Sequence, residues 1–450
     1  MKHVKGILQI VYCVGLLSIP IAHAEDLIQV YSQAVSNDPA FAKAHATWLS
    51  QKMNFPIARS SVLPSIALTG NGARNYSYVT PPSLAVINNY NWTYGYSLSL
   101  NNAIFDMGAW ASIRNAEAIV KSATASYIAA QQSLIQRTTK AYFDVMAAYE
   151  TLYFTLANKK AVTQQYEVSQ KKFKTGLIAI MDVYDARSRL DQVSSEEITA
   201  KNNLAVQIEN LRSITGHYYK KLKGLDKKLT LLRPTPNNID QWITRSEKQN
   251  YNIEAQFYNV IAALEKIRQQ SAGYAPTLDF STGVSEAQGV DSGGDKTRND
   301  NIMMGLNLSY QPIQGGLTYA SEKQARYNYT AASSELEAVY RQVHNQARTS
   351  YISIVADINH TETDRKHIVS SRQALAATEV GLKVGTRTMV DVLNDLGTVY
   401  QAQRQYINDQ YTYLNDMIDL KIAAGTLSPN DVAEINRWLT KSVTLPAPTL

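Results

Sequence analysis

The chain contains one long unit twice, and this duplication constrains its fold more than any other feature. The stretches Phe173–Asp182 and Leu382–Asp391 align at an offset of 209 residues. The same offset relates four further identical pairs: Tyr142 and Tyr351, Val183 and Val392, Leu211 and Leu420, and Gly216 and Gly425. The repeated unit is far longer than the roughly 20–50 residues of a solenoid repeat. We therefore expect two copies of one extended domain.

The duplication and the composition divide the chain into five segments. Residues 1–24 have the features of a secretory signal peptide, with two lysines, an apolar run and Ala22-His23-Ala24 at the expected cleavage point. The first repeat is expected over residues 25–216 and the second over 251–426. Between them, residues 217–250 predict an irregular insert with one strand over Leu229–Leu232, and residues 427–450 predict a C-terminal tail.

Charge and cysteine content exclude several classes of function. The formal charge is +6, and loss of Lys2 and Lys5 with the signal peptide leaves +4, which does not indicate a nucleic-acid partner. The only cysteine, Cys13, lies in that peptide, so we expect neither a disulfide nor thiol chemistry in the mature chain. After residue 24 no run approaches the ~18 apolar residues of a transmembrane helix. Any contact with a membrane is therefore expected to involve strands or the protein surface.

Uninterrupted stretches in both repeats predict very long helices. Ala109–Thr175 contains 67 residues without glycine or proline, and its apolar positions recur every three to four residues. A helix of that length spans ~100 Å, which no compact globular core accommodates. Gly176 then precedes a second run over Leu177–Thr215, so we expect a helical hairpin with its tip at about 173–182. The second repeat predicts the same hairpin, with its tip at about 382–391 and one interruption at Gly397.

Each repeat also predicts two strands, over about 63–105 and about 277–313, with a charged, glycine-rich loop over Gly289–Asn301. In the clearest strands apolar residues alternate with small or polar ones, which is typical of a strand with two different faces. The apolar members are Trp92, Tyr94, Tyr96, Leu98, Leu100, Met304, Leu306, Leu308 and Tyr310. This pattern fits a transmembrane β-barrel in which these residues face lipid and the small polar ones face water.

Four strands are too few to close a barrel, because single-chain membrane barrels begin at about eight. Open strand edges are not tolerated in lipid, so the strands must be shared between chains. Two copies would supply eight strands and three would supply twelve. A barrel of eight is just filled by its own side chains, whereas a larger one can leave a passage. Twelve strands therefore suit a conduit better.

Four groups of short motifs occur in order along this duplicated plan. They are Ile104-Phe105-Asp106-Met107, Leu211-Arg212 with Ile214-Thr215-Gly216 and Tyr218-Tyr219, Pro276-Thr277-Leu278-Asp279, and Gly385-Thr386-Arg387-Thr388 with Val390-Asp391-Val392-Leu393. Taken together, these motifs resemble those of the TolC-type outer-membrane channels of Gram-negative bacteria. The resemblance covers nearly all of residues 25–440.

The resemblance implies an α+β membrane protein that is a homotrimer. Its twelve-stranded barrel, four strands per chain, would lie in the outer membrane and continue as an α-helical tunnel through the periplasm. Such channels are exit ducts for multidrug efflux pumps and for type I secretion. They work with a periplasmic adaptor (membrane fusion) protein and an inner-membrane RND or ABC pump. Neither enzymatic activity nor a cofactor is expected.

The acids near the hairpin tips have two interpretations. An aspartate in the first turn of a helix stabilises free backbone N–H groups and the helix dipole, and Asp182 and Asp391 both fit that role. The resemblance implies a gate instead, in which Asp391 forms a carboxylate ring at the closed end of the pore and Arg387 binds Asp182 of a neighbouring helix pair. Four further positions belong to this predicted constriction. In place of the second acid of the family's ring stands Asn394, with Asp395 beside it, while Leu382 and Met181 replace a tyrosine and a threonine of the family's gate.

The tips themselves also have two interpretations. Gly176 and Gly385 fit simple turn glycines. The resemblance implies that they form adaptor-contacting tips together with Leu177, Thr386 and Thr388.

Alternative functions lack a supporting pattern. His360 and His367 could share a helix face, but two isolated histidines are weak grounds for a metal site, and none is expected. Gly289–Lys296 departs from a phosphate-binding loop because Asp295 stands where the lysine belongs. A periplasmic coiled-coil adaptor would explain the hairpins without needing lipid-facing strands. A structural protein without a pore would explain long helices without needing two matching tips.

Overall fold

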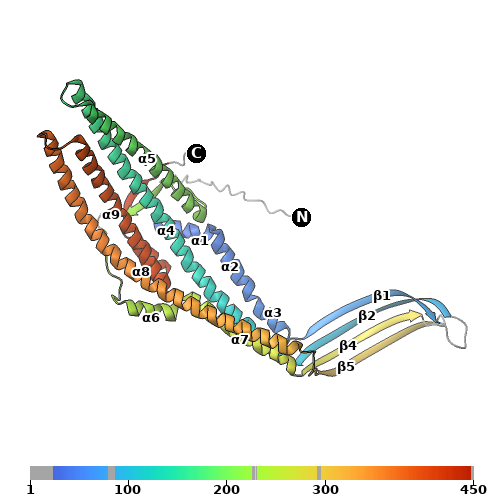
Figure 1. Cartoon of the computed structure of the whole chain (residues 1–450). Coiled ribbons are helices and arrows are strands. Elements are labelled where there is room, and N and C mark those ends of the chain that lie inside the picture. The colour runs from blue at the N-terminus through green and yellow to red at the C-terminus, as the bar shows by residue number, and fades with distance from the viewer. Residues whose placement is uncertain (1–23, 80–86, 226–228, 230, 291–294, 447–450) are drawn as a thin grey trace, which may run out of the picture.

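The molecule is elongated, with a four-stranded sheet at one end and two helical hairpin tips at the other (Figure 1). This computed structural model describes residues 24–79, 87–225, 229, 231–290 and 295–446. The expected signal peptide lies outside these residues except for Ala24. Among the described residues, none of the helices combines the length and apolarity needed to cross a membrane.

The sheet joins the two repeats. Its strands are β1 (Ser65–Val79), β2 (Ile87–Phe105), β4 (Thr277–Val290) and β5 (Lys296–Ser309), in the order β1-β2-β4-β5. All three pairings are antiparallel, and β2 of the first repeat pairs with β4 of the second. The expected loop over Gly289–Asn301 was wrong for most of its length, because β4 continues to Val290 and β5 begins at Lys296. Its polar residues are strand residues that pair across β4 and β5.

Two very long helices run between the sheet and the tips, and two shorter helices return from the tips to the middle of the molecule (Figure 1). They are α4 (Met107–Lys174, 68 residues) with α5 (Ile180–Thr215), and α8 (Leu317–Lys383, 67 residues) with α9 (Met389–Ala423). At ~1.5 Å per residue the long helices measure about 100 Å. Asp106 begins α4 by accepting a hydrogen bond from the Ala109 N–H, and Gly216 ends α5 in the left-handed conformation. These caps explain why both residue types stand at the helix boundaries.

Shorter helices precede the strands in each repeat. The first repeat has α1 (Leu27–Asn37), α2 (Pro39–Lys52) and α3 (Asn54–Ser60), whereas the second has α7 (Tyr251–Ser271) and the short 3-10 turn η1 (Ala272–Tyr274). Asp38 separates α1 from α2, and its side chain accepts a hydrogen bond from the Phe41 N–H at 2.6 Å. The same buried carboxylate pairs with Arg137 of α4 at 2.9 Å, which joins the first helices to the long one.

The segment between the repeats is more ordered than expected. It contains β3 (Lys221–Leu225) and α6 (Ile239–Gln249), and the tail supplies α10 (Pro429–Asn436) and β6 (Leu439–Thr444). β3 pairs with β6 in a two-stranded antiparallel sheet. The expected strand over Leu229–Leu232 was wrong, since its described residues are irregular. The true strand lies earlier because its partner is more than 200 residues away, and local composition carries no information about that pairing.

The main apolar core surrounds this middle region, where α1, α4, α5, α9 and the small sheet meet. Its largest fully buried side chains include Tyr142, Phe143 and Tyr413. The Tyr142 hydroxyl donates to the Lys223 carbonyl at 2.5 Å and accepts from the Lys223 N–H at 3.0 Å. The buried ring thus satisfies its polar atom on β3. This core fixes both hairpins at their bases and leaves their tips projecting (Figure 1).

Candidate functional site at the sheet and the hairpin tips

The two faces of the four-stranded sheet differ sharply in polarity. Residues directly opposite each other in neighbouring strands share a face, and one such row is Leu68, Leu98, Val284 and Ile302. The adjacent rows of that face contain Ile66, Leu100, Thr282, Met304, Phe280 and Leu306. The opposite face has rows of small or polar side chains, which include Thr69, Ser97, Ser285 and Asn301. The sheet is therefore apolar on one side and polar on the other.

The nine residues that the alternation singled out all lie on the apolar side or its continuation. Eight of them are exposed in the single chain, and Leu100 is half-buried. Met304 is 76% exposed, whereas a methionine packed in a hydrophobic core would be almost fully buried. From Ile302 to Tyr310 the apolar face runs for roughly 27 Å along the strand direction, close to the ~25 Å apolar band of membrane barrels.

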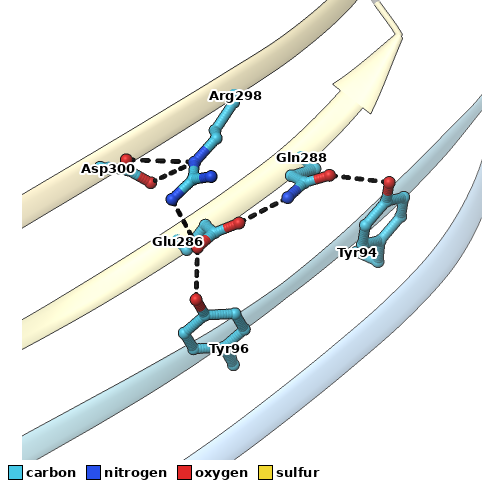
Figure 2. A network of polar contacts seen from close by, with 6 residues as sticks. All are labelled: Tyr94, Tyr96, Glu286, Gln288, Arg298 and Asp300. Atoms are coloured by element: carbon cyan, nitrogen blue, oxygen red, sulfur yellow. Dashed lines mark hydrogen bonds and ion pairs between the residues drawn. The ribbon is translucent and has the colours of Figure 1, made fainter.

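A polar network ends this apolar face toward the far end of the sheet (Figure 2). The Arg298 guanidinium donates to Glu286 at 3.1 Å and to both Asp300 oxygens at 3.0 and 3.1 Å. The Tyr96 hydroxyl donates to Glu286, and the Tyr94 hydroxyl donates to Gln288 at 2.8 Å. Each tyrosine therefore uses its hydroxyl to bind the polar side chain directly opposite it on β4.

Four polar members of this network were missed in the sequence, namely the two partners of the tyrosines and the two residues bound to Glu286 or to its arginine. Glu286, Gln288, Arg298 and Asp300 lie in the stretch that was expected to end one strand and form a loop. The signal was the alternation itself, because Glu286 and Gln288 continue the spacing of Val284 at every second residue.

The two hairpin tips are built by the same backbone turn. The Leu177 N–H donates to the Lys172 carbonyl at 2.9 Å, and the Thr386 N–H donates to the Gly381 carbonyl at 2.9 Å. These bonds correspond at the 209-residue offset and close a Schellman motif at the end of each long helix. The residue before each donor is a glycine with positive φ, +71° at Gly176 and +81° at Gly385. The repeated glycine is required by this turn, whatever else binds there.

Asp391 forms the capping box of α9. Its side chain accepts hydrogen bonds from the Thr388 N–H and from the Thr388 hydroxyl, both at 2.9 Å, while its own N–H donates to that hydroxyl at 3.2 Å. These backbone and side-chain hydrogen bonds hold the pKa of Asp391 below its usual range. The half-buried carboxylate is therefore ionised at neutral pH. A local capping role accounts for Asp391 in the single chain.

Asp182 and Arg387 lie in the two tips without bonding each other inside one chain. Within the described part of the chain Arg387 forms no ion pair, and its Cγ packs over Gly381, where an added Cβ would come within 2.7 Å. Asp182 stands in the first turn of α5 beside the exposed Met181. The predicted contact between Arg387 and Asp182 is therefore not formed among the described residues of one chain.

The remaining gate positions separate into two environments. Leu382 packs against an apolar group that we call the tip cluster, which combines both hairpins: Val162, Ala186 and Val193 from the first, and Met389 and Leu393 from the second. Asn394 is exposed, but Asp395 accepts a hydrogen bond from Thr378 of α8 and so lies in the seam of its own hairpin. The structure therefore does not bring Asp395 beside Asn394 on one surface.

Paired carboxyl groups in the second hairpin are a further feature that the sequence analysis missed. Asp357 and Asp364 of α8 face Asp416 and Asp409 of α9, respectively. Burial and the neighbouring carboxyl groups raise the pKa of Asp357 to about 7 and that of Asp409 to about 6. One Oδ2 atom in each pair, on Asp357 and on Asp364, is buried without a hydrogen-bond partner. The signal was present as acids spaced seven residues apart on both helices.

No group of three or more His, Cys, Asp or Glu side chains among the described residues has the geometry of a metal site. The hydroxyl of Ser371 lies 3.3 Å from the His367 Nδ1 on the same helix.

Comparison with known proteins gives a consistent result. The model of the "Outer membrane efflux protein" family matches residues 30–217 and 242–426. The chain is 36% identical to outer membrane protein TolC of Escherichia coli K12 over 436 residues, covering 94% of this chain and 87% of that protein. It is 23% identical to the alkaline protease secretion protein AprF of Pseudomonas aeruginosa, covering 91% and 86%. The crystal structure of the Campylobacter jejuni CmeC outer membrane channel superposes with a TM-score of 0.76 at 18% identity, covering 91% and 89%.

Proposed function

Because the chain belongs to the outer membrane efflux protein family, we propose that three copies share one twelve-stranded barrel in the outer membrane and one helical tunnel beneath it. The protein is an outer-membrane exit duct for efflux and secretion. The trimer explains how a chain with only four barrel strands can form such a duct.

The observation that carries this proposal is the pair of open strand edges beside an apolar face. β1 and β5 are the edge strands, with 15 and 14 residues, and each leaves one side of its ladder unpaired in the single chain. Unpaired backbone groups cost several kcal/mol each in hydrocarbon. Pairing β5 of one copy with β1 of the next would satisfy both edges, and three copies would close the ring. The rows with Thr69 and Ser97 would then face the water inside.

The long hairpins would continue this ring as a tunnel. Each chain contributes two hairpins, so a trimer has six, with the left-handed glycine turns at its far end. We propose that these tips contact a periplasmic adaptor protein and that an RND or ABC pump in the inner membrane supplies the cargo. Leu177, 73% exposed beside Gly176, offers an apolar contact at each first tip.

The same trimer would bring together the gate residues that one chain keeps apart. We propose that Arg387 binds Asp182 of a neighbouring copy and that three copies of Asp391 form a carboxylate ring. The apolar Leu382 and Met181 add no hydrogen bond to this latch. An exposed ion pair contributes ~0–1 kcal/mol, so the closed state of the pore would depend on three weak contacts acting together.

The barrel is tested by two arginine substitutions on neighbouring residues of β2. Leu98→Arg places a charge in the row of Leu68 and Val284 on the apolar face, at a cost of ~2–4 kcal/mol per chain near the bilayer midplane. Ser97→Arg adds the same charge to the polar face. We expect Leu98→Arg to reduce the amount of heat-modifiable trimer recovered from outer membranes, whereas Ser97→Arg inserts normally and alters single-channel conductance.

The mass of the detergent-solubilised protein provides the second measurement. Mass photometry of the parent protein should give three chains per particle. A stable monomer or dimer in a preparation that inserts into bilayers would refute the shared barrel. Equal insertion of the two arginine variants would show that the assignment of faces is wrong.

A further inference from the structure

A small polar cavity lies between the two hairpins of one chain, between the tips and the middle of the molecule. Its volume is about 150 Å³, and it is lined by α4, α5 and α9. The side chains that reach it include Asn158 of α4, Arg189 and Gln192 of α5, and Arg404 of α9. Neither the capping of the tips nor the apolar packing of the tip cluster uses these residues.

Among the described residues, neither Arg189 nor Arg404 has a carboxylate partner. The Arg189 Nη1 donates to the Gln192 Oε1 at 2.8 Å, and the Gln192 Nε2 donates to the Glu196 Oε1 at 3.1 Å. Thus Glu196, the one acid in the lining, binds the amide and neither guanidinium. The Arg189 Nε is buried with no hydrogen-bond partner, and Arg404 forms no ion pair within the described residues. Two positive groups that line one cavity repel each other unless an anion lies between them.

Gly397 makes room for this arrangement. A Cβ added at Gly397 would lie 2.2 Å from the Arg189 Nη2, so any other residue there would displace the guanidinium. This explains the single glycine inside α9, where glycine costs ~1 kcal/mol relative to alanine. The corresponding residue of the first hairpin, at the 209-residue offset, is Ser188. The space left by this glycine therefore exists in the second hairpin only.

Asn158 indicates which anion would fit. Its side chain is only 5% exposed, and its Oδ1 is buried in the cavity lining without a hydrogen-bond donor. An unsatisfied buried acceptor costs ~1–3 kcal/mol, and a ligand with an O–H group would satisfy it. Hydrogen phosphate has both the charged oxygens that guanidinium groups bind and an O–H donor. Sulfate has the oxygens alone.

We propose that this cavity binds hydrogen phosphate between Arg189 and Arg404, with the phosphate O–H donating to the Asn158 Oδ1. The bound anion joins α5 of the first hairpin to α9 of the second. It therefore stabilises the contact between the two hairpins next to the predicted gate. The cavity lies in the helical part of the molecule, at the opposite end from the sheet, so free inorganic phosphate is the ligand rather than a lipid headgroup.

The test is isothermal titration calorimetry of the full-length mature protein in detergent, with inorganic phosphate and sulfate in separate titrations. We expect one site per chain, with a Kd for phosphate below about 1 mM and binding of sulfate at least about tenfold weaker. Arg404→Gln should weaken phosphate binding by about tenfold or more. Arg341→Gln, an exposed arginine of α8 paired with Glu337, is the matched control and should leave it unchanged.

A second variant tests the discrimination. Asn158→Ala removes the acceptor and should bring phosphate and sulfate binding to within about threefold of each other. Arg404→Gln, at a half-buried surface position, keeps the proposal testable if the Asn158 variant does not fold. The proposal is refuted if the parent protein shows no saturable phosphate binding up to about 10 mM, or if Arg404→Gln and Arg341→Gln bind phosphate equally well.

Discussion

Replacing Asp357 and Asp416 by asparagine should stabilise the second hairpin at neutral pH and weaken the pH dependence of its stability. The two carboxyl groups face each other between α8 and α9, and the pKa of each is raised, chiefly by burial. The first repeat has Ala148 and Gln207 at the equivalent positions. At these positions the second hairpin therefore has two acidic side chains between its helices, whereas the first hairpin has none.

The sign follows from where the protons bind. The pKa of Asp357 rises from its ordinary value of 3.8 to about 7, so the folded hairpin binds protons more tightly than the unfolded chain. The contribution of this pair to stability is therefore greatest below about pH 4 and is lost as the pH rises through about 7. A pKa shift of this size would change the free energy of unfolding by ~4 kcal/mol for a fully buried group. Because Asp357 is half-buried, we expect ~1–2 kcal/mol, discounted for solvent screening.

Neighbouring groups limit the effect without reversing it. The positive charge of Lys140 acts on Asp416 in the opposite direction, whereas Asp419 raises its pKa further. The second pair, Asp364 and Asp409, faces His360 and Gln405 and stays in place in the double variant. A reduced pH dependence is therefore expected, and not its complete loss.

Hydrogen–deuterium exchange of peptides from α8 and α9 measures this local stability. After correction for intrinsic exchange rates, parent peptides near Asp357 and Asp416 should be about five- to thirtyfold more protected at pH 5 than at pH 8. The double asparagine variant should lose much of this difference. Asp185→Asn, which removes one charge from the first hairpin, should behave like the parent. Greater protection of the parent at pH 8, or an unchanged pH dependence in the double variant, would refute the reasoning.

Three other predictions concern the tips and the base of the helices. Arg387→Ser should raise single-channel conductance in planar bilayers, whereas Asp391→Ala should leave the pore closed and reduce block by multivalent cations; the opposite result would show that the two roles are exchanged. Gly385→Ala should speed hydrogen exchange at the second tip several-fold, because the left-handed conformation costs a residue with a Cβ ~1–2 kcal/mol. Asp38→Ala should lower the free energy of unfolding by ~2 kcal/mol through loss of the α2 cap and the Arg137 pair, measured by denaturant unfolding in detergent at pH 7. Burial alone would raise the pKa of Asp38, but the Arg137 and backbone hydrogen bonds lower it overall, so this loss should shrink as the pH falls below about 4.

Local patterns in the sequence determined the long helices and the facing of the strands. The absence of glycine and proline over Ala109–Thr175 leaves no residue that would end a helix, and the structure forms one helix over Met107–Lys174. The alternation around Leu98 likewise assigns each side chain to a face, because successive strand residues point in opposite directions. The repeated Gly176 and Gly385 mark the tips for an equally local reason, since each closes the turn that follows its own helix.

The tertiary structure decided the features that depend on residues far apart in the chain. β3 is a strand because β6 lies beside it, and Arg298 is a strand residue that binds Glu286. Arg189 and Gly397 are more than 200 residues apart, so the glycine looked like a simple interruption until the two helices were packed together. Periodicity reports only which side of an element a residue occupies. The partner that it meets there is set by packing between helices whose facing residues are far apart in the sequence. That packing produced the carboxylate pairs within the second hairpin, and the tip cluster and the cavity between the two hairpins.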